Sequence, residues 1–131
     1  MTTLPATAAL LFALLAGGVG VFQLALVLGA PWGEFTLGGR WPGRLPASGR
    51  WLAALSLMLL VVFSVLILAR AGLGLGLAGL EAWSRPGAWV VVAYCALGSV
   101  ANVMTRSRRE RRLWLPVVLC MLGLSLVVAG A

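Results

Sequence analysis

The chain has 131 residues, of which 62% are hydrophobic and 10% are charged, and its mean hydropathy is +1.06. A soluble domain holds about 25% charged residues, so this composition excludes an ordinary soluble fold and favours a membrane protein. The net charge is +7 and all 10 basic residues are Arg, but they flank apolar runs, so we do not expect the chain to bind nucleic acid.

The residue types on which most metal, haem and redox sites depend are scarce. The chain has no His, and its two Cys, Cys95 and Cys120, lie inside apolar runs without forming a C-x-x-C pair. We therefore expect no metal and no cofactor, and a thiol–disulfide oxidoreductase is disfavoured.

Four nearly uncharged runs predict four membrane-spanning helices, because about 20 apolar residues cross the hydrocarbon of a bilayer. The predicted spans are residues 6–30, 51–69, 87–105 and 113–131. The first run is too long for the core of a signal peptide and no basic residue precedes it, so we expect a permanent helix. The predicted fold is an all-α integral membrane four-helix bundle, a single domain over residues 1–131.

The loop between the first two spans is the least generic segment of the chain. Residues 29–46 hold five Gly, three Pro and two Trp, which predicts defined turns rather than a helix. The loop is either an interfacial cap anchored by Trp32 and Trp41 or a lid that folds into the mouth of the bundle. Glu34 and Arg40 are its candidate binding residues.

The Arg residues are distributed unevenly between the loops. The first and third loops together hold eight Arg, whereas the opposite ends of the spans hold only Arg70 and Arg85. The positive-inside rule therefore predicts that the Arg-rich loops are cytoplasmic and that both termini are extracytoplasmic. The second loop, residues 72–79, is rich in Gly and is predicted to be a flexible linker.

The third loop, residues 106–112, carries five Arg around Glu110. The cluster either sets the orientation in the membrane or binds anionic lipid headgroups, to which each basic residue adds about 1 kcal/mol. Glu34 and Glu110 are expected to pair with neighbouring Arg residues.

The string GAPWG-x4-GG-x2-PG-x-LP at residues 29–46, with a second landmark around Asn102, Glu110 and Trp114, resembles a family of small, uncharacterised four-span bacterial integral membrane proteins. The resemblance covers most of the chain and implies a multi-pass protein of the bacterial inner membrane. The family brings no agreed activity, so function is argued from the residues.

Polar residues inside the spans are few. At 1.5 Å per residue, Gln23, Ser56, Ser99 and Cys120 fall roughly 7–11 Å below the cytoplasmic boundary, and Asn102 shares a helix face with Ser99. These groups either line a cavity under the first loop or hold the helices together by hydrogen bonds. The candidate ligand-binding residues at this cytoplasmic mouth are Gln23, Trp32, Glu34, Arg40, Ser99, Asn102, Glu110 and Trp114.

Three classes of function remain to be compared. A proton-coupled transporter is disfavoured because no predicted span carries Asp or Glu. A membrane enzyme acting on a lipid or lipophilic substrate would depend on Glu34, Glu110 and Tyr94. The sequence best fits a non-enzymatic protein that binds a small lipophilic ligand or serves as an accessory subunit of a membrane complex. The expected partners are membrane lipids, including anionic ones, and a second copy or a larger complex.

Overall fold

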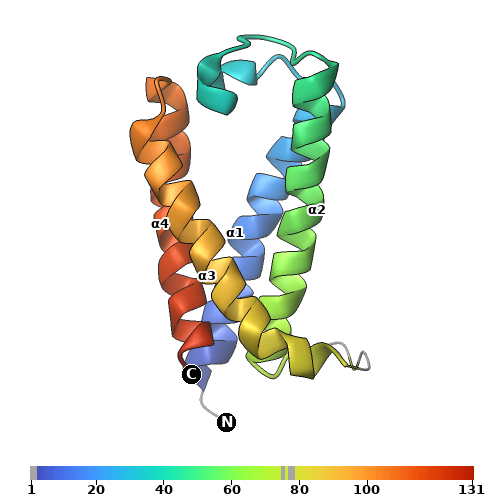
Figure 1. Ribbon diagram of the computed structural model, residues 1–131, viewed down its shortest axis with the longest axis vertical. Helices are drawn as coiled ribbons and strands as arrows, with labels where there is room; N and C mark the ends of the chain where they lie inside the picture. Colours follow the sequence, from blue (N-terminus) through green and yellow to red (C-terminus); the bar gives the residue numbers. More distant parts are fainter. Residues whose placement is uncertain (1–2, 75, 77–78) are drawn as a thin grey trace.

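Four long helices make up most of the computed structural model, which describes residues 3–74, 76 and 79–131 (Figure 1). They are α1 (Thr3–Val27), α2 (Ala47–Arg70), α3 (Leu80–Met104) and α4 (Arg108–Ala129). Each helix is long and apolar enough to cross a membrane, and no strand occurs among the described residues. The all-α class and the four candidate spans are therefore confirmed.

Helices α2, α3 and α4 extend beyond the predicted spans at their charged ends, whereas α1 ends at Val27, three residues before the end of its predicted span. Helix α3 begins at Leu80 rather than at residue 87, and it contains Glu81, Arg85 and Pro86. Helix α4 begins at Arg108 and takes in most of the third loop. Apolarity marks only the part of a helix that crosses hydrocarbon, whereas the helical backbone continues where water or headgroups solvate the charged side chains.

Small residues allow the helices to approach closely. A Cβ added at Gly20 of α1 would lie 3.3 Å from the Leu57 side chain of α2, and one added at Gly87 of α3 would lie 2.8 Å from Leu66 of α2. Close approach of this kind is the usual way in which membrane helices gain packing contacts, because lipid already satisfies their apolar surfaces.

The main core fills the end of the bundle that holds the termini. Its largest fully buried side chains are Phe12, Ile67, Val91 and Val128, one from each helix. Toward the other end α3 leans away from α2 and stays beside α4 (Figure 1). This divergence leaves room for a cavity at the end of the bundle opposite the termini.

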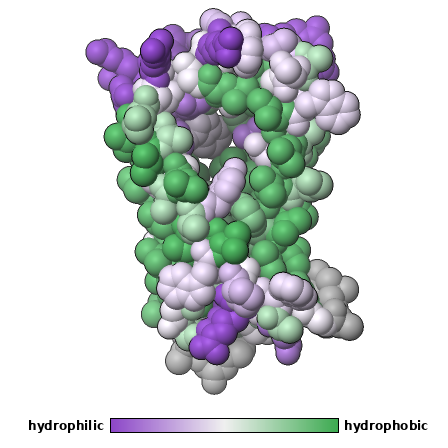
Figure 2. Space-filling view, in the orientation of Figure 1, coloured by the Kyte–Doolittle hydropathy of each residue, from purple (hydrophilic) through white to green (hydrophobic). Residues whose placement is uncertain are grey.

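Both termini lie at one end of the bundle, and the first loop lies at the other (Figure 1). Figure 2 shows an apolar belt between two polar ends, as expected for a protein that spans a bilayer. The linker between α2 and α3 is at the end with the termini, and its residues 75, 77 and 78 lie outside the described residues.

Candidate ligand-binding cavity

Residues 29–46 fold into a compact segment, which we call the cap, over the end of the bundle (Figure 1). The cap contains two short 3-10 helices, η1 (Gly33–Phe35) and η2 (Leu37–Gly39). The Gly33 N–H donates to the Gly43 carbonyl at 2.8 Å and closes the segment on itself. Gly33 is buried, and an added Cβ would lie 1.9 Å from the Trp41 carbonyl oxygen, so no larger residue fits there.

The cap is attached to the α1–α2 hairpin by packing and by one guanidinium group. Leu45 of the cap is buried against Leu26 of α1 and Ala53 of α2. Arg50, in the first turn of α2, donates from Nε and Nη2 to the carbonyl of Val27 at 2.9 and 2.7 Å. Since Val27 ends α1, Arg50 satisfies a carbonyl that the helix leaves unpaired, a role beyond setting the orientation in the membrane.

The cap is also attached to α4. The Trp114 indole N–H donates to the Phe35 carbonyl at 2.8 Å, and the Ser107 hydroxyl donates to the Glu34 carbonyl at 2.7 Å. The Glu34 carboxylate forms an ion pair with Arg109 at 2.7 Å, which confirms the pairing expected for Glu34. Both groups of this pair are partly exposed, so it contributes about 0–1 kcal/mol.

Glu110 departs from its expected pairing. Ser107 and Glu110 have the spacing of a capping box, in which the Glu side chain returns to the N–H of the N-cap residue. The Ser107 hydroxyl does accept the Glu110 N–H at 3.1 Å, but Glu110 Oε2 accepts the N–H of Gly38 in the cap at 3.2 Å. Within the part of the chain that the structure describes, Glu110 forms no ion pair with Arg, so that expectation is wrong.

A cavity of about 480 Å³ lies beneath the cap. Small-molecule sites commonly measure about 300–1,000 Å³. All four helices and the cap contribute to its lining. The apolar lining includes Val19, Leu60, Cys95, Val117, Val118 and Met121. The polar lining consists of Gln23, Thr36, Ser56, Tyr94, Asn102, Thr105, Glu110 and the indole of Trp114.

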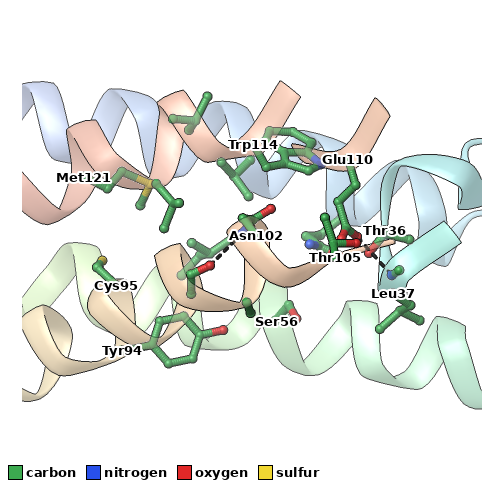
Figure 3. Close-up of a pocket in the computed structure, with 18 of the residues that line it drawn as sticks. Thr36, Leu37, Ser56, Tyr94, Cys95, Asn102, Thr105, Glu110, Trp114 and Met121 are labelled. Atoms are coloured by element: carbon green, nitrogen blue, oxygen red, sulfur yellow. Dashed lines mark hydrogen bonds between the residues drawn. The ribbon is translucent and has the colours of Figure 1, made fainter. Parts of the chain in front are cut away.

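Polar groups gather at the cap end of the cavity but are not confined to it, since Tyr94 lies toward the Cys95 end (Figure 3). Glu110, Thr36 and Thr105 lie together at the cap end, whereas Cys95 and Met121 lie at the opposite end. Asn102 lies between them. A molecule that fits this lining has a polar head toward the cap and an apolar body toward the middle of the bundle.

The cavity opens sideways, between α2 and α3. Tyr94 and Met104 of α3 line the cavity and are 43% and 76% exposed. Figure 2 shows the hollow below the polar rim, with apolar surface on either side. In a protein that spans a bilayer, such an opening faces lipid rather than water.

The structure brings together four of the eight candidate residues chosen from the sequence. Gln23, Asn102, Glu110 and Trp114 line the cavity. In the cap, Trp32 stacks against Phe22 of α1 with ring centroids 6.1 Å apart, and the Arg40 guanidinium lies 4.8 Å from the centre of the Trp41 ring. Glu34 faces Arg109, so these three cap side chains lie outside the cavity lining.

Of the four polar groups for which the sequence left open either cavity lining or hydrogen bonds between helices, two line the cavity. Gln23 and Ser56 line it, but the Ser99 hydroxyl is buried and donates to the Cys95 carbonyl of its own helix at 2.8 Å. Cys120 is exposed on α4. Depth along a helix locates a residue along the membrane normal, whereas the direction of its side chain depends on helix rotation, which packing decides.

Sequence reasoning did not select Thr36 and Thr105, which complete the polar end of the cavity. Thr36 lies in the cap and Thr105 directly follows α3. At such positions no helical periodicity indicates the direction of a side chain. Among the described residues, no three Cys, Asp or Glu side chains lie close enough together to hold a metal ion.

Comparison of the chain with protein-family models, curated proteins and solved structures finds no match. The family resemblance of the cap sequence therefore stays a prediction, and function rests on the geometry of the cavity.

Proposed function

We propose that this integral membrane protein binds a small lipophilic molecule with a polar head, which enters the cavity beneath the cap from the surrounding lipid. The observation that carries the proposal is a cavity of ligand size that is closed by the cap, polar at the cap end and open toward lipid through its side.

The hydrogen-bond inventory favours a binding site over simple helix–helix adhesion. Polar side chains that hold membrane helices together form hydrogen bonds with neighbouring helices. Within the described residues, the side chains of Gln23, Ser56 and Tyr94 make no hydrogen bond, although all three line the cavity. Polar groups in an apolar surrounding are normally satisfied, so water or a ligand is the natural partner here.

The proposed orientation follows the Arg residues. With eight Arg at the cap end and two at the other, the cap lies on the cytoplasmic side of a bacterial inner membrane and both termini lie outside. The head of the bound molecule is then close to the cytoplasmic headgroups, where amphipathic molecules of the bilayer carry their polar ends.

Blocking the side opening tests the proposal. Ala101 is exposed and lines the cavity, so Ala101→Trp places a large ring in the opening without disturbing the core. We expect native mass spectrometry in mild detergent to show a retained small molecule on the wild-type chain and its loss from Ala101→Trp. Ala93→Trp, at an exposed position of α3 that does not line the cavity, is the matched control and retains it.

A wild-type chain that carries no small molecule under the mildest activation contradicts the proposal. Equal retention by Ala101→Trp and Ala93→Trp contradicts it as well, because the molecule then binds elsewhere. The remaining candidate in either case is an accessory subunit, which is identified by the membrane proteins that co-purify with it.

A further inference from the structure

The charge inside the cavity differs in sign from the charge around it. The cap end of the molecule is strongly basic, and yet no Arg lines the cavity in the described part of the chain. The one formally charged lining group there is the carboxylate of Glu110. A bound molecule therefore meets a negative site within a positive rim.

The Glu110 carboxylate is positioned by a hydrogen bond to one of its oxygens, and the other oxygen remains able to accept. Glu110 Oε2 accepts the Gly38 N–H, whereas Oε1 makes no hydrogen bond within the described residues. Asn102 donates from Nδ2 to the Gly98 carbonyl at 2.8 Å, which leaves its Oδ1 as an acceptor. The polar end of the cavity thus offers fixed acceptors, which suit a molecule that donates hydrogen bonds.

The aromatic residues of the lining also favour a positively charged ligand. Trp114 and Tyr94 both line the cavity, and the electron-rich faces of such rings attract cations. The Trp114 indole N–H, a donor that would repel a cation, is turned to the Phe35 carbonyl. The indole N–H is therefore already paired within the protein and is not free to donate to a bound molecule.

We propose that the bound molecule is a lipophilic cation, with an ammonium group at Glu110 and Asn102 and a hydrocarbon body against Leu60, Val117 and Met121. This inference rests on the proposed function and names the chemical class of its ligand. An anionic head would meet the Glu110 carboxylate at short range in a medium of low dielectric constant, which is repulsive.

Three probes that share one hydrocarbon cage test the charge preference: aminoadamantane, adamantanol and adamantanecarboxylate. The protein is placed in nanodiscs of zwitterionic phosphatidylcholine at pH 7, and binding is corrected for partition into empty nanodiscs. We expect the ammonium to bind about 10-fold or more tightly than the alcohol, because only the ammonium adds the attraction of opposite charges to its hydrogen bond with the carboxylate, and the carboxylate probe to bind most weakly.

Glu110→Gln removes the charge and keeps an oxygen that can accept the Gly38 N–H. In this variant the ammonium loses its advantage and binds like the alcohol, and continued binding of the alcohol above the empty nanodiscs shows that the cavity is intact. Glu34→Gln removes the other acid at the same end, which lies outside the cavity lining, and keeps the preference for the ammonium.

Equal binding of the ammonium and the alcohol, or a preference for the ammonium that survives Glu110→Gln, overturns the inference and leaves the proposed function standing. Tightest binding of the carboxylate overturns it in the same way. If none of the three probes binds above the empty nanodiscs, or if Ala101→Trp leaves binding unchanged, the cavity is not a binding site and both proposals fail.

Discussion

Gly33 shows how a single residue determines the shape of the cap. Its backbone N–H bonds to the Gly43 carbonyl, and its α-carbon lies so close to the Trp41 carbonyl that a methyl group would overlap it. The cap in turn supplies Thr36, which lines the polar end of the cavity. Gly33, which does not itself line the cavity, therefore determines where the cap places Thr36.

Replacing Gly33 by Ala should destabilise the cap. The added Cβ would lie 1.9 Å from a backbone oxygen, and overpacking of this kind costs about 1–3 kcal/mol. We expect a lower midpoint of thermal unfolding in detergent and faster proteolytic cleavage within residues 29–46. Gly17→Ala, with no atom within 4 Å of the added Cβ, is the control and lowers neither the midpoint nor the resistance to proteolysis, because Ala favours a helix interior over Gly. Equal behaviour of the two variants would contradict the packing argument.

The sequence placed the candidate residues at the end of the bundle where the cavity lies, and four of the eight that it selected line the cavity. Gln23 and Asn102 were predictable because helical spacing fixes which residues lie at one level and on one face, and Trp114 because Trp is typical of the end of a membrane span. Trp32 and Arg40 were misplaced because the direction of a loop side chain depends on turns that no periodicity encodes.

At the scale of the helices, the beginning of α4 ties the cap to the bundle. The Ser107 hydroxyl accepts the Glu110 N–H as the N-cap of α4 and donates to the Glu34 carbonyl of the cap. Apolarity predicted all four helices, but not this helix start, because α4 begins in a run of Arg residues that looks like a loop. The start of α4 is therefore defined by two hydrogen bonds of the Ser107 hydroxyl, one with the Glu110 N–H of the helix and one with the Glu34 carbonyl in residues 29–46.

Ser107→Ala should therefore cost more than the loss of an ordinary surface hydroxyl. Loss of an N-cap costs about 0.5–2 kcal/mol, and loss of the second hydrogen bond adds about 1 kcal/mol. We expect thermal unfolding in detergent to show a clear decrease in stability for Ser107→Ala. Ser48→Ala, at an exposed position whose hydroxyl makes no hydrogen bond among the described residues, should show almost none. A decrease of equal size in both variants would argue against the double role.

At the scale of the whole molecule, the bundle has a basic end that carries the cap and an end that carries both termini. The number of crossings places the two Arg-rich loops together, and this was predictable from the sequence. The sideways opening was not, because it arises where α3 leans away from α2, and the angle between helices depends on packing that a hydropathy pattern does not contain.

Cysteine labelling tests the proposed orientation. In a chain with Cys95→Ala and Cys120→Ala, a single Ser48→Cys marks the cap end and a single Glu81→Cys marks the other end, and both positions are exposed. We expect a membrane-impermeant maleimide to label Glu81→Cys on intact bacteria and to label Ser48→Cys only after lysis, because the Arg-rich end stays inside. The reverse pattern would show the opposite orientation.

Under the proposed function, a side opening toward lipid makes the bilayer the reservoir from which the cavity fills. The relevant concentration is then the mole fraction of the ligand in the membrane, and not its concentration in water. Each added CH₂ favours partition into lipid by about 0.8 kcal/mol, so a homologous series would gain about fourfold in apparent affinity per carbon without one new contact in the protein. Selectivity among ligands would then have two sources: partition into the membrane would discriminate by the length of the hydrocarbon tail, and binding in the cavity would discriminate by the polar head.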